Sequence, residues 1–161
     1  MNYIDLKLVD TLYGKGVIVN KVFTMGQRVL EFSGPRLHRD DLPPISNFED
    51  DRYLQVGPVE YIGESKGLDD FVNHSCKPNC KVVITNEEVF LEAIEIIEVG
   101  SEITFDYSTT MDENDWELDC LCGNLECRAR VRDFRTLPTH VKDNYIKLGA
   151  IPDFIIRAGI Y

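Results

Sequence analysis

The chain has 161 residues, 43% of them hydrophobic, and a formal net charge of −11. This length and composition predict one domain with its own core. The acidic balance disfavours direct nucleic-acid binding, which needs clustered positive charge. We expect a soluble intracellular protein with no membrane partner, because no apolar run could span a bilayer and residues 1–5 lack the features of a secretory signal. The charge would attract a basic partner such as a lysine-rich peptide, although on charge alone a simple role in solubility is favoured.

The N-terminal half reads as short strands. Gly16–Asn20 and Arg28–Phe32 are rich in β-branched or aliphatic residues, with a turn at Met25-Gly26 between them. Residues 37–51 are polar, contain Pro43-Pro44, and predict a loop. Further strands are expected at 53–56 and 59–62 around Gly57-Pro58, at 81–84 and 89–93 as a hairpin, and at 103–107.

The C-terminal part changes character. A helix is predicted over about Pro138–Leu148, because proline suits a helix start and Gly149 suits its end. The apolar stretch 151–161 is expected to pack back onto the body. The fold class is therefore mostly β with some α, built from several small sheets.

Five cysteines occupy positions 76, 80, 120, 122 and 127. An odd number in an intracellular chain fits disulfides poorly. Cys120, Cys122 and Cys127 lie within eight positions, and three thiolates this close suit tetrahedral zinc. Gly123 would let the chain turn around the ion, and Arg128 and Arg130 would help to keep the thiolates ionised.

The fourth ligand of this zinc is open from spacing alone. It could come from a partner, from Cys76, Cys80 or a histidine of this chain, or from water, and water would make the zinc catalytic. The competing interpretation, free and partly buried thiols, is disfavoured by the tight spacing.

Three further segments carry chemistry only in combination. They are Gly14-Lys15-Gly16 before a strand, residues 71–80 with Asn73-His74-Ser75-Cys76, and residues 102–107 ending in Phe105-Asp106-Tyr107. Taken singly, the first is an ordinary turn, the second is ordinary loop chemistry, and Tyr107 is a core tyrosine with a bonded hydroxyl.

In this order, and followed by the cysteine cluster, the segments closely resemble the SET-domain protein lysine methyltransferases. The resemblance runs from about Tyr13 to Cys127 and includes the family's post-SET zinc motif. A cysteine-rich pre-SET segment is not seen, so the chain looks like a minimal member.

The resemblance implies a role for each matching residue. Gly14, Lys15 and Gly16 match the loop that lies against S-adenosylmethionine, and Asn73 and His74 match the pair that holds it. Tyr107 matches the catalytic tyrosine, which also borders the cofactor, and Phe105 and Tyr107 match the substrate channel. Cys76 matches the fourth ligand of a structural zinc, beside Cys120, Cys122 and Cys127, which leaves Cys80 as a packing residue.

The implied fold is a set of small curved sheets in which the Asn73–Cys76 and Asp106–Tyr107 segments form a pseudoknot. Its expected divisions are a SET domain at 1–118, a post-SET zinc segment at 119–132 and a C-terminal helical extension at 133–161 of unassigned role. For Tyr53, Tyr61 and Trp116, core packing is preferred over a place on the channel.

The resemblance implies transfer of methyl groups from S-adenosylmethionine to lysine in a basic protein. Phe105, where the family has Phe or Tyr, implies that the enzyme goes past monomethylation; a core aromatic without such control is the alternative. Two other functions compete: a SET-like zinc-containing binding module without turnover, and a small zinc protein that mediates contacts. The presence of Asn73, His74 and Tyr107 favours the enzyme.

Overall fold

The computed structural model describes residues 3–11, 14–44, 51–114 and 116–159. Tyr13, where the resemblance begins, lies outside the described residues, as do both chain ends and part of the expected loop, residues 45–50. Within the described parts, no helix is long and apolar enough to cross a membrane.

A two-stranded and a three-stranded sheet contain the first three strands together with β8 (Cys80–Ile84) and β9 (Val89–Ala93). β1 (Leu6–Thr11) pairs antiparallel with β2 (Gly14–Val19), and β9 lies between β3 (Arg28–Glu31) and β8. The predicted hairpin at 81–93 is confirmed, because β8 and β9 pair in register across the turn. β1 was not predicted, since only one of its six residues is buried and the burial along the strand shows no clear alternation.

A second three-stranded sheet has the order β4-β6-β5, with β4 at Arg36–His38, β5 at Leu54–Gln55 and β6 at Glu60–Ile62. The strands expected around Gly57-Pro58 are confirmed as the antiparallel pair β5 and β6. The loop expected at 37–51 is wrong at its start. There β4 pairs with β6, and a 3-10 turn at Arg39–Asp41 follows, positioned by the Arg39 amide donating to the Val59 carbonyl at 2.8 Å.

The two motif segments meet in a short parallel pair. β7 (Asn73–His74) pairs with β10 (Thr104–Phe105), although about thirty residues separate them in the sequence. The strand expected at 103–107 is shorter than predicted, because Asp106 caps a 3-10 turn over Tyr107–Thr109 by accepting a hydrogen bond from the Ser108 amide. The pairing brings the segments side by side; their passage one through the other stays a prediction.

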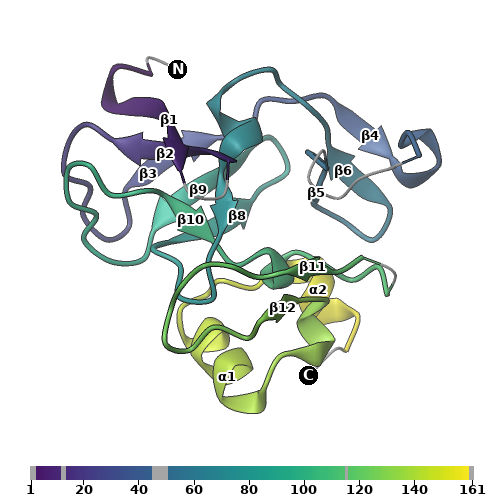
Figure 1. Ribbon diagram of the computed structural model, residues 1–161. Coiled ribbons are helices and arrows are strands. Elements are labelled where there is room, and N and C mark those ends of the chain that lie inside the picture. The colour runs from purple at the N-terminus through teal and green to yellow at the C-terminus, as the bar shows by residue number, and fades with distance from the viewer. Residues whose placement is uncertain (1–2, 12–13, 45–50, 115, 160–161) are drawn as a thin grey trace.

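The C-terminal part contains β11 (Leu118–Asp119), β12 (Arg130–Val131), α1 (Thr139–Lys147) and α2 (Asp153–Arg157). In Figure 1 these elements form the end of the molecule opposite the N-terminus. The predicted helix is confirmed as α1, with Pro138 at its N-cap and Gly149 in a left-handed conformation (φ 57°) just beyond its end.

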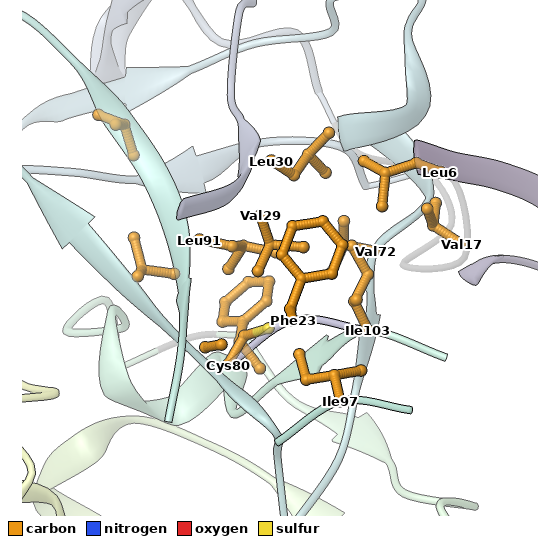
Figure 2. Close-up of a cluster of buried hydrophobic side chains, with 14 of the residues drawn as sticks. Leu6, Val17, Phe23, Val29, Leu30, Val72, Cys80, Leu91, Ile97 and Ile103 are labelled. Carbon is orange, nitrogen blue, oxygen red and sulfur yellow. The ribbon is translucent and has the colours of Figure 1, made fainter. Parts of the chain in front are cut away.

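Two hydrophobic clusters support this arrangement. The larger one joins the strands, and Figure 2 shows Phe23, Leu30 and Leu91 meeting Val72 and Ile103 within it. The smaller one lies in the C-terminal part and contains Phe134, Leu137, Tyr145, Ala150, Ile151 and Ile155. Of the stretch expected to pack back onto the body, Ile151 and Ile155 are buried within this smaller cluster, and packing of the stretch onto the strand core stays a prediction. Each fully buried aliphatic or aromatic side chain contributes roughly 1.5–3 kcal/mol by leaving water.

Candidate active site and metal centre

Asn73 joins the three motif segments. Its side-chain amide donates to the Lys15 carbonyl at 2.9 Å and to Glu102 Oε1 at 2.7 Å. One side chain therefore ties the glycine loop, the Asn73–His74 strand and the start of the 102–107 segment together. Sequence spacing did not indicate Glu102 as part of the site, because only the fold brings its carboxylate to Asn73.

The glycines of the loop serve two purposes. Gly16 lies so near Glu102 that a Cβ there would be 2.2 Å from Oε1, so any larger residue would displace the carboxylate. Gly14 has φ 102° and no heavy atom within 4 Å of where its Cβ would be. The backbone at Gly14 thus borders open space that a ligand could fill. The Lys15 side chain pairs instead with Asp10, at 2.8 Å.

His74 is held as a neutral ring. Its Nδ1 accepts from the Tyr107 amide at 3.2 Å, and its Nε2 lies 3.4 Å from Cys76 Sγ. Burial lowers the pKa of His74 to about 4, although the Asp106 carboxylate raises it. The 3.5 Å approach of Asp106 Oδ1 to Nδ1 is therefore not an ion pair at neutral pH, because Nδ1 carries no proton.

Tyr107 lies at the junction of these groups. Its hydroxyl donates to the Val72 carbonyl at 2.7 Å, and its ring packs 4.8 Å from Phe105 and 5.3 Å from His74, between centroids. Burial raises the pKa of Tyr107 well above its ordinary value. The hydroxyl stays protonated near neutral pH, so it can orient and polarise a ligand but does not act as a base.

A cavity opens beside Phe105 and Tyr107. Aromatic side chains make up much of its wall, and acidic groups line it as well; the lining includes Phe32, Tyr53, Tyr61, Phe105, Tyr107, Trp116, Asp51, Asp69, Asp70 and Glu113. Of the three aromatics for which core packing was preferred, Tyr61 is buried as expected (2% exposed), whereas Tyr53 and Trp116 are only half-buried, and all three border the cavity. Sequence reasoning could not separate the two roles, because a buried aromatic suits a core and a channel wall equally well.

Polar groups on the cavity wall are linked to one another. The Tyr61 hydroxyl donates to Glu113 Oε1 and accepts from Arg39 Nη2 at 3.3 Å. Burial raises the pKa of Glu113, although the Tyr61 hydrogen bond and Arg39 lower it, and burial also raises the pKa of Asp51. The cavity therefore combines an apolar lining with carboxyl groups, a combination that suits a long side chain with a cationic end.

Four cysteines meet near His74. The Sγ atoms of Cys76, Cys120, Cys122 and Cys127 all lie within 4.8 Å of one another, and those of Cys76 and Cys120 are 3.7 Å apart. Zinc–sulfur bonds of about 2.3 Å in a tetrahedron would separate the sulfurs by roughly 3.8 Å. The donor set and its spacing are compatible with zinc. Cys80 lies elsewhere, buried on β8, and burial raises the pKa of its thiol to about 12.

The peptide backbone supports this cluster. Gly123 turns the chain with φ 68°, and the amides of Arg128 and Ala129 donate to the sulfurs of Cys76 and Cys127, each at 3.4 Å. Such donors orient thiolate ligands of a metal. Of the two arginines expected to favour ionised thiols, Arg128 has this effect on Cys76, whereas Arg130 pairs with Glu117 and with Asp119, the latter at 2.7 Å.

The thiols need a cation in order to ionise together. Burial raises the pKa of Cys76 to about 11 and raises that of Cys120 further. Backbone amides and neighbouring thiols outweigh burial at Cys122 and lower its pKa to about 7. Four ionised sulfurs at this spacing repel one another, and a divalent metal removes that cost.

Comparison with known proteins agrees with this geometry. The family model described as the SET domain matches residues 14–108. An H3 lysine-4 specific histone-lysine N-methyltransferase of Saccharomyces cerevisiae is 28% identical over 120 residues, which cover 64% of this chain and 11% of the relative. The set-2 histone-lysine N-methyltransferase of Caenorhabditis elegans is 42% identical over 63 residues, covering 37% of this chain and 4% of the relative. The chain thus spans only a small part of these relatives.

Solved structures share the fold. KRYPTONITE in complex with mCHH DNA, an H3(1–15) peptide and SAH aligns with a TM-score of 0.64 at 24% identity, over 79% of this chain and 29% of that one. SUVH6 of Arabidopsis thaliana in complex with SAM aligns with a TM-score of 0.66 at 21% identity, over 79% of this chain and 33% of that one. The small sheets and the few helices therefore form the same fold as in these proteins.

Proposed function

The chain belongs to the SET-domain family, and on this premise we propose that it transfers methyl groups from S-adenosylmethionine to the side-chain amine of lysine in a protein substrate. The observation that carries the proposal is the chain of hydrogen bonds that joins the Gly14–Gly16 loop to Asn73-His74 and His74 to Tyr107, which lines the cavity. Open space lies next to the backbone at Gly14.

S-adenosylmethionine, when bound, supplies an electrophilic methyl group on its sulfonium. The open space at Gly14 gives it room, and Asn73 holds the loop by its hydrogen bond to Lys15. The neutral ring of His74 adds no positive charge to repel a sulfonium. We assign to the cofactor site Gly14, Lys15, Gly16, Asn73, His74 and Tyr107.

The substrate lysine would enter the cavity lined by Phe105 and Tyr107. Its amine must be neutral to form the N–C bond as the methyl group leaves sulfur, and the charged product then loses a proton to water. Reaching the neutral form from a pKa of about 10.4 costs roughly 4–5 kcal/mol near neutral pH. A dry aromatic wall lowers that cost, because burial disfavours the ammonium form. The carboxyl groups of Asp51 and Glu113 would attract the cation as it approaches.

Tyr107 acts by position rather than by taking a proton. Burial holds its pKa high, so its hydroxyl remains neutral, and the Val72 carbonyl fixes the direction of the O–H bond. A fixed dipole next to the reacting centre costs no reorganisation during the reaction. Tyr107 is therefore the catalytic residue of the proposal, and Phe105 shapes the channel beside it.

The four cysteines would hold a structural zinc. Zinc, when bound, supplies four strong bonds that crosslink the chain. Cys76 comes two residues after His74 of the cofactor pair, whereas Cys120, Cys122 and Cys127 come after Tyr107. Four sulfur ligands leave no open position for substrate. The proposed divisions are accordingly a SET domain at 1–118, a zinc-binding post-SET segment at 119–132 and a helical extension at 133–161.

The proposed substrate is a basic protein, because the chain carries a net charge of −11 and its cavity is acidic. The amino-terminal tail of histone H3 is the first candidate, since one relative is named as H3 lysine-4 specific and one structural neighbour holds an H3(1–15) peptide. Direct contact with nucleic acid is not part of the proposal, because the acidic surface disfavours it. The expected location is intracellular.

The proposal is tested with labelled S-adenosylmethionine and a panel of basic proteins that includes histone H3 and its tail peptide. We expect label on lysine with the wild-type chain. Tyr107→Phe removes only the hydroxyl and should lower the rate by about 100-fold or more, as the loss of one preorganised polar group does in other enzymes.

Binding of S-adenosylhomocysteine, measured by calorimetry, provides the control. Tyr107→Phe should bind it within about threefold of the wild type, because the backbone contacts of the cofactor site remain. Asn73→Ala, which unties the Lys15 loop, should weaken binding more. Absence of both label transfer and cofactor binding in the wild type would overturn the proposal; binding without transfer would leave the inactive binding module.

A further inference from the structure

Asp106 is a buried carboxylate directly before Tyr107. Its side chain has no exposed surface, and its residue as a whole is 1% exposed. A carboxylate removed from water is costly unless hydrogen bonds and a counter-charge replace its hydration. The groups that surround Asp106 are therefore a structural requirement, and they come from three separate parts of the chain.

The first two partners bind Oδ1. The Ser108 amide donates to it at 3.1 Å, within the 3-10 turn, and Arg128 Nη2 donates at 2.7 Å from the segment that follows Cys127. The third partner is Tyr145 of α1, whose hydroxyl donates to Oδ2 at 2.7 Å across 39 positions of sequence. Among the residues that the structure describes, Tyr145 is the one that donates to that oxygen.

Asp106 is coupled to the reacting groups through the backbone. It caps the turn that begins at Tyr107, and the amide of Tyr107 donates to His74 Nδ1 at 3.2 Å. A rotation of the Asp106 carboxylate would move the Ser108 amide and the start of this turn. The direction of the Tyr107 side chain, and of its hydroxyl toward Val72, therefore depends on the position of Asp106.

Tyr145 is itself held firmly. It is 4% exposed and packs in the smaller hydrophobic cluster with residues such as Phe134 and Ile155. The end of α1 is tied to the strand core by Lys81 Nζ, which donates to the Leu148 carbonyl at 3.0 Å. Burial and the neighbouring Asp106 raise the pKa of Tyr145, so its hydroxyl remains a donor.

We propose that Tyr145 is a positioning residue of the active site: its hydroxyl, presented by the C-terminal helical extension, fixes Asp106 and through it the Tyr107 turn. The extension is then part of the catalytic architecture and not an added cap. This inference rests on the proposed methyl transfer, in which Tyr107 is the catalytic residue. The two parts of the Tyr145 side chain then have different roles. The ring packs in the smaller hydrophobic cluster, and only the hydroxyl positions Asp106.

Tyr145→Phe tests the hydroxyl alone, since the ring and its packing are kept. We expect kcat for the transfer of labelled methyl groups to fall about three- to tenfold, the range that one lost hydrogen bond gives, while the KM for the protein substrate stays within about twofold. The matched control is Ile155→Val, which trims the same cluster without touching Asp106. Its kcat should equal that of the wild type.

Amide hydrogen exchange, followed by NMR, gives a readout that does not need turnover. In Tyr145→Phe the Ser108 amide should exchange at least about threefold faster, because its acceptor is less fixed. The amides of Val82 and Leu91 in the strand core should be unchanged. In Ile155→Val the Ser108 amide should exchange as in the wild type.

The outcomes are distinct. Equal kcat in Tyr145→Phe and the wild type would overturn the inference, and so would an equal loss of kcat in Ile155→Val, which would show that only the packing of the extension matters. A wild-type chain without methyl transfer would overturn the proposed function instead. In that case unchanged exchange at Ser108 would also overturn the positioning role, whereas faster exchange would support it.

Discussion

The strand core and the C-terminal part are held together by different forces. The core joins strands through a continuous apolar cluster that runs from Leu6 to Phe105 in the sequence. Between Asp106 and Arg132 the contacts are mostly polar: the cysteine cluster, the buried Asp106–Arg128 pair and exposed pairs such as Arg132–Glu117. A second, smaller cluster follows at the C-terminal end.

The two kinds of contact have different consequences: one contributes mainly to the stability of the fold, and the other fixes the positions of individual side chains. Apolar burial is non-directional, so a core made by it resists unfolding but fixes no single atom closely. Metal–thiolate bonds and charge-assisted hydrogen bonds are directional and hold individual groups in place. Tyr107 and His74, which the proposed reaction requires in exact positions, lie where the two regions meet. Substitutions in the C-terminal part should therefore change mainly the rate of methyl transfer, and substitutions in the strand core should change mainly the free energy of unfolding.

Removal of the metal should have the largest effect. Chelation of zinc, or Cys122→Ser, should lower methyl transfer by more than about 100-fold, because the segment after Tyr107 loses its link to Cys76. Amide exchange should rise at Cys120, whose amide donates to the Ala129 carbonyl at 2.8 Å, while Leu91 in the core stays protected. Metal content and transfer rate are measured on the same samples.

Cys80→Ala is the matched control, since this buried thiol lies on β8 outside the cluster and its loss should leave the metal content unchanged. Return of zinc to the chelated protein should restore transfer. Full activity of the metal-free protein would mean that the C-terminal part holds its place without zinc, and the contrast between the two regions would fail.

A substitution that creates a cavity in the strand core should destabilise the strand core and the C-terminal part together. Leu91 is fully buried in β9, the central strand of its sheet. Leu91→Ala should lower the free energy of unfolding by about 2–5 kcal/mol, as lost burial and an unfilled cavity do in other cores. Urea unfolding should show one transition for both regions, because the C-terminal part has only a small cluster of its own. Two separate transitions would instead show that the extension folds independently.

The sequence predicted the elements whose signals are local. Buried and partly buried residues alternate along β9, and α1 is bounded by Pro138 and Gly149. The two-residue strands β7 and β10 carry no pattern of their own, since they exist only because the fold aligns them in parallel. Short pairs of this kind depend on tertiary context and not on propensity.

The residues of the site also fall into those that local sequence spacing indicates and those that only the fold brings together. Spacing indicated three of the four cysteines, but from the residues alone Cys76, Cys80 and the histidines were equal candidates for the fourth ligand, and only the family resemblance selected Cys76. The cavity groups Tyr61 and Glu113 are 52 positions apart and meet through the fold. Tyr145 gave no signal at all, because a helix tyrosine is an ordinary core residue until Asp106 is seen beside it.

A change at Phe105 should alter the product more than the rate. Phe105 belongs to the strand core, is 5% exposed, and also lines the cavity beside Tyr107. Phe105→Tyr would add a hydroxyl in space that a methylated amine needs, and a polar group that holds the amine. Mass spectrometry of the product should show the trimethylated fraction falling about threefold or more, since one steric or polar contact is worth roughly 1 kcal/mol. A wild-type level of trimethyl-lysine in this variant would contradict the role of Phe105.

The smallest effect is expected at Arg130. Its substitution tests whether exposed ion pairs of the C-terminal part contribute as its buried contacts do. Arg130 is exposed and pairs with Glu117 and Asp119, whereas Arg128 reaches the buried Asp106. Exposed pairs contribute little, because water and salt screen them. Arg130→Gln should therefore leave the melting temperature, the zinc content and the transfer rate within error of the wild type at physiological salt. Loss of zinc in this variant would mean that the guanidinium of Arg130 helps to keep the thiolates ionised from a distance. The contrast between the two regions would then rest on the net charge around the cluster as well as on directional bonds.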